Sequence, residues 1–397
     1  MAATIRIVTD LEEFKSLEEV WNNVLHQCRE HSSIYLTYEW SWIWWKHFGA
    51  GKKLNILIIE SEGEVIGIIP LMKVDHGLGL FKIHVLETIG STNYNNVGLI
   101  PIKNNKEAMI ALIKYFQEEL SGNKSILRLT FVPANSYFLN LLRGHDHIDM
   151  KSTVIREKFM TLAPYISLPT TWEEYFSSLG KRRRKVLHRA LRSLEKEHTF
   201  EFKHFTLDTM EEELGRYFKL HQARWQSINI RSIFSNPRMR EFYIEIANHF
   251  SKKDWLYFSY LTIDGEMVSA EFGSIYNQKL YAFNAARDIR YLKYSVGHLH
   301  KMYLLQDAIR KQLVEFDFLK GAEPYKFYWT KSFRKYVQVI MFKKCSYASL
   351  RFGLLYALLR LDEIIQNRHT LKEVFSLYRM KRMGEKEREK MRLFQDY

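Results

Sequence analysis

Hydrophobic and polar residues recur along this chain with two different periods. Short runs rich in Ile, Leu and Val, bounded by turn residues, predict strands. Stretches with apolar residues three and four positions apart predict amphipathic helices. The predicted strands cover residues 5–8, 54–60, 65–73, 81–89, 126–132, 153–157, 161–168, 199–205, 255–263, 267–276 and 314–319, with one more from residue 280. The predicted helices cover residues 10–28, 106–119, 171–196, 208–227 and 237–250, with others near residues 38–48, after Pro133 and after Gly297. Strands and helices are interspersed, which predicts a mixed α/β (α+β) fold.

The stretch from Leu280 to Arg334 carries the clearest functional signal. It begins as a strand, passes through a short loop with Ser295 and Gly297, and continues as an amphipathic helix. A second strand and a polar turn ending in Tyr325-Lys326 follow. Because the first turn of a helix has unpaired backbone N–H groups, this order of strand, loop and helix predicts a cradle for a phosphate.

The two halves of the chain repeat one order of elements. The first half reads as a hairpin (LNILIIESEGEVIGIIPL), a strand, a polar loop, a helix (KYFQEEL) and a strand (SILRLTF). The second half has LYFSYLTIDGEMVSAEF, YAFNAA, KYSVG, LLQDAIRKQ and VEFDFL in the same places. This internal duplication predicts two domains, at residues 1–169 and 170–345, each a mixed sheet flanked by helices, before a basic helical tail at 346–397. Only the second half runs a Ser/Gly loop straight into a long helix. We therefore expect the chemistry there and a binding or scaffolding role for a degenerate first domain.

Composition narrows the kind of protein and of partner. Hydrophobic residues make up 46% and aromatic residues 15% of the 397 residues, which excludes a disordered chain. A formal net charge of +14 predicts an anionic partner, such as nucleic acid, a phosphorylated cofactor, a nucleotide sugar or an anionic membrane face. Cys28 and Cys345 lie far apart and outside any zinc or disulfide pattern, so we expect no metal.

The expected location is the cytoplasm, with peripheral contact at the inner face of the membrane as an option. The N-terminal residues lack the basic and apolar regions of a signal peptide. The apolar segment at 350–361 is interrupted by Arg351 and Arg360 and is shorter than the roughly 20 residues that a bilayer span needs. The charged tail from Ser346 is expected to be a solvated helix or to contact a membrane surface or a partner.

The strongest basic cluster is the run Lys181–Lys185 (KRRRK), continued by Arg189 and Arg192. Such a cluster suits the phosphates of CoA, of tRNA or of an anionic glycolipid, and it also fits a solvated helix face. No RNA-binding motif accompanies it, which makes a dedicated reader of nucleic acid the weaker interpretation. The aromatic run YEWSWIWWKHF has two interpretations as well, a helix packed on a sheet or a binding wall, and packing is the favoured one.

One helix and one loop supply candidate polar side chains. His221, Arg224 and Trp225 share a helical face. The histidine is a candidate base for an attacking amine, because its ordinary pKa lies near working pH, and a packing residue is the alternative. Arg224 and Trp225 are candidate substrate contacts. Tyr94 and Asn95, in the polar loop of the first half, are expected to hydrogen-bond the substrate.

Three carboxylates complete the candidates. Asp317 lies in the middle of an apolar strand, and Glu323 follows in the turn before Lys326. Either one serves as a base or orients the lysine, unless the contact is a simple ion pair. Glu271, also in mid-strand, is the third candidate and is expected to contact substrate.

Eight phrases of the sequence, in this order, resemble the GNAT-type acyltransferases of the CelD/BioF2-like group, which is related in structure to the Fem aminoacyltransferases of peptidoglycan synthesis. They are TYEWSWIWWKHFG, EVIGIIPLMKV, LETIGSTNYNNVGLI, KRRRKVLHRALRSLEKE, KLHQARW, DGEMVSAEFGSIYNQKLYAFNAARD, YSVGHLHKMYLLQDAI and FDFLKGAEPYKFYW. The resemblance runs from about Tyr35 to Lys335. No phrase alone is unique to the group, and their order gives the specificity.

This resemblance implies two GNAT-like domains and an N-acyltransferase. The implied donor is an acyl-CoA, acetyl-CoA included, and the implied acceptor is an amine on an amino sugar, a nucleotide sugar or an envelope or polysaccharide precursor. The donor pyrophosphate would lie on the backbone of Lys293, Tyr294, Ser295, Val296 and Gly297. This loop has one glycine where the GNAT pattern has two, so a different donor stays open.

The pair Tyr325-Lys326 is similar to the aromatic-lysine pair near the end of Fem transferase domains, where the lysine stabilises negative charge. Acyl transfer passes through an oxyanion, and a cation in a partly dehydrated site stabilises that oxyanion more strongly than the same charge in water. Two alternatives remain. One is a Fem-like transferase that uses aminoacyl-tRNA, and the other is a non-catalytic binding or scaffold protein of polysaccharide biosynthesis.

Overall fold

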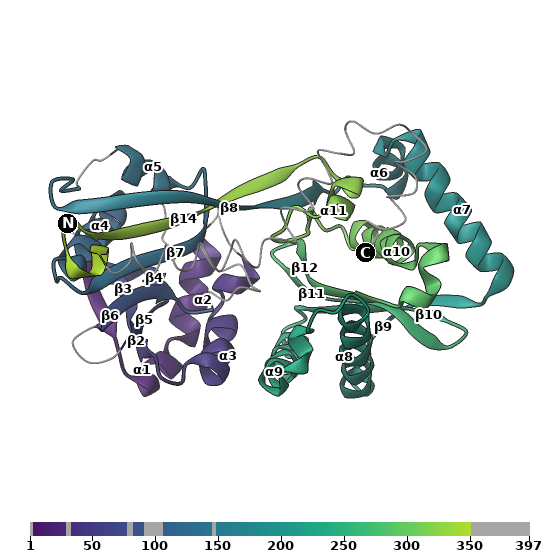
Figure 1. The fold of residues 1–397 in the computed structure, drawn as a ribbon, viewed down its shortest axis with the longest axis horizontal. Helices are drawn as coiled ribbons and strands as arrows, with labels where there is room; N and C mark the ends of the chain where they lie inside the picture. Colours follow the sequence, from purple (N-terminus) through teal and green to yellow (C-terminus); the bar gives the residue numbers. More distant parts are fainter. Residues whose placement is uncertain (1–2, 29–32, 78–81, 91–105, 145–147, 351–397) are drawn as a thin grey trace.

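The computed structural model describes residues 3–28, 33–77, 82–90, 106–144 and 148–350. Within these residues the chain forms an 11-stranded sheet and a separate 3-stranded sheet, with helices on both faces of the large sheet (Figure 1). The expected mixed α/β class is confirmed. No helix in the described ranges is long and apolar enough to cross a membrane.

The strands are β1 (Thr4–Val8), β2 (Lys53–Leu54), β3 (Ile56–Ser61), β4 (Glu64–Ile69), β5 (Leu71–His76), β6 (Ile83–Thr88), β7 (Ser125–Pro133), β8 (Thr153–Ser167), β9 (Phe200–His204), β10 (Leu256–Ile263), β11 (Glu266–Tyr276), β12 (Lys279–Arg287), β13 (Glu315–Asp317) and β14 (Phe333–Lys343).

The helices are α1 (Leu11–Ser16), α2 (Glu18–Gln27), α3 (Tyr38–Phe48), α4 (Lys106–Leu120), α5 (Tyr137–Gly144), α6 (Trp172–Ser178), α7 (Lys181–Glu197), α8 (Met210–Gln226), α9 (Pro237–Lys252), α10 (Val296–Arg310) and α11 (Pro324–Trp329), with short 3-10 helices η1 (Ile34–Leu36), η3 (Ile233–Ser235) and η4 (Ile289–Tyr294).

Two lobes share the large sheet, whose strand order is β2-β5-β6-β7-β14-β8-β13-β12-β11-β10-β9. We call β1–β7 with α1–α5 the N-terminal lobe, and β9–β13 with α6–α11 the C-terminal lobe. Figure 1 shows β8 and β14 running side by side from one lobe to the other. They pair antiparallel from Phe333↔Pro164 to Lys343↔Thr153. Strand β14, from the C-terminal end of the described chain, thus lies between β7 and β8 and joins the lobes into one sheet.

Each lobe contains one parallel pair of strands, which fits the repeated order of elements in the sequence. In the N-terminal lobe β6 runs parallel to β7, and in the C-terminal lobe β12 runs parallel to β13. A helix connects the strands of each pair, α4 in the first and α10 in the second. The domain boundaries near 169 and 345 stay predictions, because β14 is hydrogen-bonded to strands of both predicted domains.

The helix caps and the hairpin turn predicted from local sequence are present in the structure. The side chain of Asp10 accepts the N–H groups of Glu12 and Glu13 at the start of α1. The Thr171 side chain accepts the N–H of Glu174 at the start of α6. The Asp264-Gly265 turn has positive φ at both residues, 50° and 85°, as a tight hairpin requires.

Several expected boundaries are wrong. The helix expected over 171–196 is two helices, because Leu179 and Gly180 adopt extended ψ angles of 135° and 143° between α6 and α7. The helix expected over 10–28 divides at Leu17 into α1 and α2. The strand expected over 65–73 divides at Pro70, whose missing N–H interrupts a ladder.

Pairing also changes two expected strands. The segments 153–157 and 161–168 form one strand, β8, because β14 pairs along nearly its whole length. The strand expected over 314–319 is reduced to β13, since Leu319 adopts a positive φ of 58° and turns the chain away. The tail lies outside the described residues from 351 onward.

The aromatic run in α3 packs between the lobes. Trp40 and Trp44 are buried, and Trp40 meets Phe242 of α9 edge to face at 5.4 Å between ring centroids. Tyr35, just before α3, lies 5.1 Å from Phe283 of β12. One continuous apolar cluster therefore connects α2 and α3 with α8 and α9, and the packing interpretation holds for the buried residues Tyr38, Trp40 and Trp44 of this run.

Substitution of Gly273 by Ala is expected to destabilise the fold by about 1–3 kcal/mol. A Cβ there would lie 2.3 Å from the carbonyl oxygen of Tyr281, at the irregularity between β11 and β12, and backbone would have to move. Urea unfolding measures the loss. The matched control is Gly215→Ala in α8, where a Cβ meets nothing within 4 Å and a gain of about 0.5–1 kcal/mol is expected. Equal effects at the two positions would contradict this account.

Candidate active site

Strands β12 and β13 pair over three residues only, and the site forms where that pairing ends. The last pair is Tyr281↔Asp317, and beyond it β12 continues to Arg287 paired only with β11. The chain then passes through η4 into α10, so the first turn of α10 follows the part of β12 that has separated from β13. On the neighbouring strand Glu271 lies opposite Ala285, which is exposed although it sits in mid-sheet.

The start of α10 presents backbone N–H groups. Ser295 adopts a left-handed conformation (φ 53°) and its carbonyl accepts the N–H groups of His298 and Leu299. Within the described chain the N–H groups of Val296 and Gly297 have no acceptor. A Cβ at Gly297 would lie 3.3 Å from the Arg287 side chain, so glycine keeps this turn open. The arrangement suits an anion held by backbone donors.

The side chains of the loop before α10 hold it in place instead of facing outward. The Lys293 ammonium lies 3.0 Å from Glu197 at the end of α7, and the Tyr294 hydroxyl donates to the same carboxylate. His198 Nε2 lies 3.0 Å from the Tyr294 hydroxyl. Of the expected donor-binding residues, Lys293 and Tyr294 therefore position the loop, and the backbone from Ser295 to Gly297 remains for a ligand.

Lys326 lies buried on α11, with 4% of its surface exposed. Its Nζ donates to the carbonyl oxygens of Lys320 at 2.6 Å and Leu319 at 3.5 Å, and it lies 3.0 Å from Glu323. Burial lowers the pKa of this ammonium, and the Glu323 charge opposes that shift. Gly321 makes the turn feasible, because its φ is 113° and a Cβ would lie 2.3 Å from the Glu323 carboxylate.

Asp317 is buried at the end of β13, beside the turn that carries Lys326. Burial raises the pKa of its carboxyl from 3.8 to about 6; the Arg334 charge lowers that pKa and the Glu315 charge raises it. Its Oδ1 accepts the Leu319 N–H at 2.7 Å, and its Oδ2 lies 3.3 Å from Arg334 Nη1. An ionised carboxylate has about four acceptor positions, so these two contacts leave room for a proton donor.

Sequence reasoning missed Lys301, which forms a buried ion pair with Glu271. The two groups lie 2.8 Å apart, and both side chains are less than a tenth exposed. The Lys301 ammonium also lies 4.9 Å from the ring of Phe316 and 5.5 Å from that of Phe318. The only signal in the sequence was a lysine on the apolar face of a predicted helix, which identifies a partner only once the sheet is known.

Tyr325 connects the two pairs. It is 41% exposed, yet the surrounding protein raises the pKa of its hydroxyl well above the ordinary value, with Glu323 and Glu271 adding to the shift and Arg287 opposing it. The carboxylates of the two lysine pairs therefore both lie near this hydroxyl. Of the predicted residues, the structure brings Glu271 and the turn Glu323–Lys326 together around Tyr325, and the Asp317 charge lies near Lys326.

His221 lies elsewhere. Helix α8 covers the face of the sheet opposite to α10 (Figure 1), and His221 is buried there at 2% exposure. Its Nδ1 lies 2.8 Å from the Ser232 hydroxyl, and its Nε2 accepts the indole N–H of Trp225 at 3.0 Å. Burial lowers the pKa of the ring to about 4. Both nitrogens are engaged and the ring is neutral, so the geometry supports the packing alternative. Arg224 and Trp225 are half-buried on the same helix, and Tyr94 and Asn95 lie outside the described residues.

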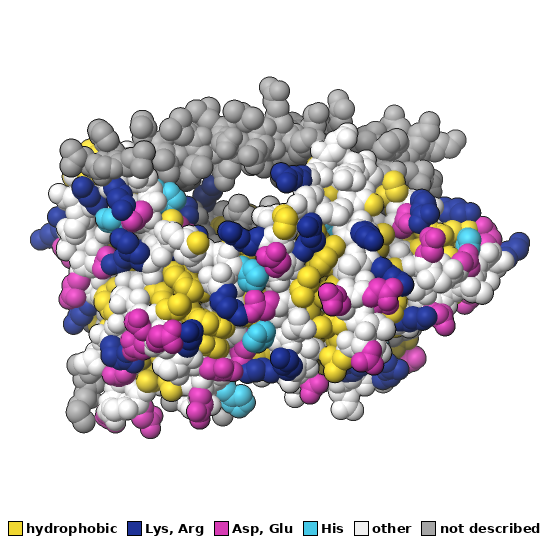
Figure 2. Space-filling model, turned by 90° about the horizontal axis from the view of Figure 1, so that it is seen from below, with side chains coloured by type: hydrophobic (Ala, Val, Ile, Leu, Met, Phe, Trp, Pro, Cys, Tyr) yellow, Lys and Arg dark blue, Asp and Glu magenta, His cyan; other side chains and the backbone are white. Residues whose placement is uncertain are grey.

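The basic run Lys181–Lys185 forms the start of α7 and contacts α11 through Arg183. Arg183 donates to the carbonyl of Phe327 at 3.2 Å, and its guanidinium lies 5.1 Å from the ring of Tyr328. Of the other cations of the run, Lys181, Arg182 and Lys185 are exposed and Arg184 is half-buried. Figure 2 shows the face that carries α8 and α9, where cationic and anionic side chains are interspersed, so that face has no surface of a single sign.

Comparison with known proteins places these elements in a family. Residues 181–327, which include α7, α10, Asp317 and Lys326, match the family model described as acetyltransferase (GNAT) domain. No curated protein sequence matches the chain. Within the described residues no group of three or more His, Cys, Asp and Glu side chains could hold a metal ion.

Solved structures show the same fold at low identity. The crystal structure of FemX has a TM-score of 0.59 and 10% identity, over 88% of this chain and 99% of that chain. A conserved protein of unknown function from Bacteroides thetaiotaomicron VPI-5482 has a TM-score of 0.55 and 11% identity, over 86% of this chain and 100% of that chain. Residues 181–327 thus match a GNAT acetyltransferase domain, and the chain as a whole shares the fold of FemX.

Proposed function

We propose that this chain transfers an acyl group from a CoA thioester to an amine, and that the C-terminal lobe performs the reaction. One observation carries the proposal: β12 and β13 separate after Tyr281↔Asp317, and beyond that point β12 leads to the open turn of α10 while β13 leads to the buried Lys326, whose ammonium lies near the Asp317 charge. A GNAT domain over residues 181–327 supports acyl transfer as the reaction class.

The donor would lie with its pyrophosphate on the N–H groups of Val296 and Gly297. Backbone N–H groups at a helix N-terminus bind phosphate without a dedicated side chain. One glycine in this loop is therefore enough for donor binding, because Gly297 lets the pyrophosphate approach the backbone closely. The Arg287 side chain beside Gly297 adds a positive charge near the same position.

The chemistry divides between two residues. An amine attacks only in its neutral form, and Asp317, with a pKa raised to about 6, accepts the proton that the amine loses as it bonds to the acyl carbon. Lys326 stabilises the negative charge on the acyl oxygen of the tetrahedral intermediate. The thiolate of CoA then leaves and recovers the proton from Asp317. The acceptor amine would belong to an amino sugar, a nucleotide sugar or an envelope precursor.

Binding of acetyl-CoA to the purified chain tests the donor. We expect a saturable heat of binding and a rise in melting temperature, because a ligand that binds only the folded state stabilises it. Gly297→Asp places a carboxylate against the pyrophosphate and is expected to abolish both signals. Gly122→Asp, at a turn where a Cβ meets nothing within 4 Å, is the matched control and should leave both intact. Absence of binding to the unmodified chain would overturn the proposal for this donor.

A second candidate donor is an aminoacyl-tRNA, favoured by the exposed Lys181, Arg182 and Lys185 on α7. Polyanion binding through lysines and arginines weakens steeply with salt. Treatment with RNase distinguishes the donors, because only the tRNA-dependent transfer is lost.

The value of kcat/KM is expected to fall about tenfold for each pH unit below about pH 6, because Asp317 accepts a proton only when it is ionised. Since its folded pKa lies above 3.8, the same carboxyl contributes less to the free energy of unfolding as pH rises from about 4 to about 6. A pH-rate profile measures the acid limb.

Two variants test whether Asp317 causes the acid limb of the pH-rate profile. Asp317→Asn is expected to remove it and to lower the plateau. Glu315→Gln keeps the plateau and moves the limb to lower pH, because the Glu315 charge contributes to the raised pKa of Asp317. A limb that survives unchanged in Asp317→Asn would assign the proton transfer to another base.

A further inference from the structure

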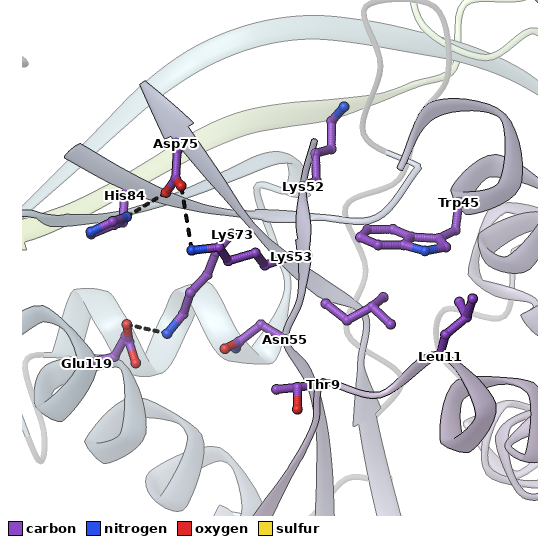
Figure 3. A pocket seen from close by; sticks show the side chains of 11 residues that line it. Thr9, Leu11, Trp45, Lys52, Lys53, Asn55, Lys73, Asp75, His84 and Glu119 are labelled. Carbon is purple, nitrogen blue, oxygen red and sulfur yellow. Dashed lines mark hydrogen bonds and ion pairs between the residues drawn. The ribbon is translucent and has the colours of Figure 1, made fainter. Parts of the chain in front are cut away.

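A pocket lies in the N-terminal lobe, at the end of the sheet far from β12 and β13. Its volume is about 750 Å³, within the ~300–1,000 Å³ of ordinary small-molecule sites. The strands β2, β5 and β6 form one wall, and α3, α4 and the segment before α1 supply the others (Figure 3). No residue assigned above to acyl transfer lines it.

The pocket has one charged side. Figure 3 shows Lys53, Lys73, Asp75, His84 and Glu119 gathered there. Lys73 lies 2.8 Å from Glu119, and Asp75 lies 2.6 Å from His84. Lys53 is 3.6 Å from Asp75, too far for a good hydrogen bond, and its side chain is 67% exposed. Its ammonium therefore makes no hydrogen bond within the described chain.

The charge balance on the lining residues is positive. Three lysines, at 52, 53 and 73, oppose the carboxylates of Asp75 and Glu119, an excess of one positive charge with histidine neutral. Lys82 lies outside the lining and contacts Asp75 at 2.6 Å. Its hydrogen bond is the main cause that lowers the pKa of Asp75 to about 2, so this carboxylate stays ionised and occupied by the protein's own cations. Lys52 donates to the carbonyl of Phe48 at 2.6 Å and Lys73 pairs with Glu119, so Lys53 is the lysine with most capacity to bind an added anion.

The other side of the pocket is apolar. Trp45 and Leu11 lie there, away from the charged group (Figure 3). The indole of Trp45 lies over the end of α3, where a Cβ on Gly49 would come within 2.6 Å of its ring atoms. Glycine at position 49 therefore sets the position of the indole. The Asn55 carboxamide, between the two sides, donates to the Tyr115 hydroxyl at 3.0 Å and is held in place.

We infer that this pocket binds a sugar ring that carries an anionic group. The apolar face of a pyranose ring stacks on an indole, as at other aromatic walls with one polar edge. The anionic group pairs with Lys53 and Lys73, and a hydroxyl donates to the Glu119 carboxylate oxygen that Lys73 does not contact. A neutral apolar ligand leaves these charges unmatched, and an aromatic ligand does not use the acceptors. The N-terminal lobe is then a binding lobe for an acidic sugar, whichever donor the C-terminal lobe uses.

Calorimetric titration of the full chain with glucuronate, glucose 6-phosphate and glucose tests this inference. We expect at least one anionic sugar to bind ten times or more tightly than glucose, and the order of the two anions distinguishes a carboxylate from a phosphate ligand. Lys53→Gln, at an exposed side chain that does not support the core, is expected to weaken anionic binding several-fold, and Lys53→Gln with Lys73→Gln at least tenfold.

Lys203→Gln in the C-terminal lobe is the matched control, since Lys203 is 43% exposed and pairs with Glu201 at 2.6 Å. It should bind all three sugars as the unmodified chain does. Melting temperatures of the variants show that they remain folded. Trp45→Leu removes the stacking wall and is expected to weaken glucose and the anionic sugars alike. No saturable binding of either anionic sugar, or equal affinity in the double lysine variant, would overturn the inference without bearing on acyl-CoA binding.

Discussion

Lys326→Met is expected to lower kcat for acyl transfer about 100- to 1,000-fold, the usual effect of removing one donor that stabilises an oxyanion. The side chain is 4% exposed, so its charge acts through a medium of low dielectric constant. Its effect appears only as negative charge develops on the acyl oxygen. The dissociation constant of acetyl-CoA should therefore change little. Assays of the rate of CoA release measure kcat, and calorimetry measures the dissociation constant of acetyl-CoA.

A structural role for Lys326 predicts a different outcome. Its ammonium donates to the carbonyls of Leu319 and Lys320, and losing those contacts costs about 1–3 kcal/mol of stability where the carbonyls stay buried. Unfolding of Lys326→Met must therefore be measured beside its rate. Lys331→Met, at an exposed lysine just after α11, is the matched control and should change neither. A folded Lys326→Met that retains full kcat would rule out the oxyanion role.

Lys301→Met is expected to destabilise the chain by about 3–5 kcal/mol, because it leaves the Glu271 carboxylate buried without its partner. Replacement of both residues, Glu271→Met with Lys301→Met, should recover most of that loss, since an apolar pair of similar volume is often as stable as a buried ion pair. Urea unfolding at neutral pH of the unmodified chain, of Glu271→Met, of Lys301→Met and of the double variant gives the four free energies of the double-mutant cycle.

The same variants show whether this pair serves the reaction. Lys311→Met is the control beside the same helix. Lys311 is 41% exposed, and the buried Asp307 keeps Arg310 and His204 as partners when Lys311 is removed, so a loss of only about 0–1 kcal/mol is expected. If the Met/Met variant is stable and active, the pair is structural. If it is stable and has lost kcat with KM unchanged, the pair positions the acceptor beside Tyr325. A Lys301→Met variant as stable as the unmodified chain would contradict the buried pair itself.

Local signals allowed much of the fold to be predicted. The caps at Asp10 and Thr171 and the Asp264-Gly265 hairpin depend on residues within a few positions of each other, and all three are present in the structure. The predicted ends of a strand were wrong where its pairing with a strand distant in sequence determines its length. Strand β8 is continuous only because β14 pairs with it, and more than 150 residues separate the two in sequence.

The candidate site divides in the same way. Asp317, Glu323 and Lys326 lie within ten residues of each other, so their proximity followed from one turn of the chain. The pairing of Glu271 with Lys301 depends on how α10 packs over β11, which no local pattern specifies. His221 was a reasonable candidate by residue type, and its contact with Phe234 and its two hydrogen bonds, which favour packing, come from segments that sequence reasoning did not bring together.

The sequence by itself determined the mixed α/β class, the repeated order of elements, the loop before α10 and the turn that carries Lys326, because hydrophobic period, turn chemistry and helix capping act over short distances. Only the tertiary structure decided which charges are paired, which are buried and which line a pocket. Those properties depend on β14 joining the two lobes and on helices covering opposite faces of one sheet, and they set the pKa of Asp317 and the partners of Lys53. Burial and long-range pairing come from contacts between distant segments, so they are decided only when the chain is folded.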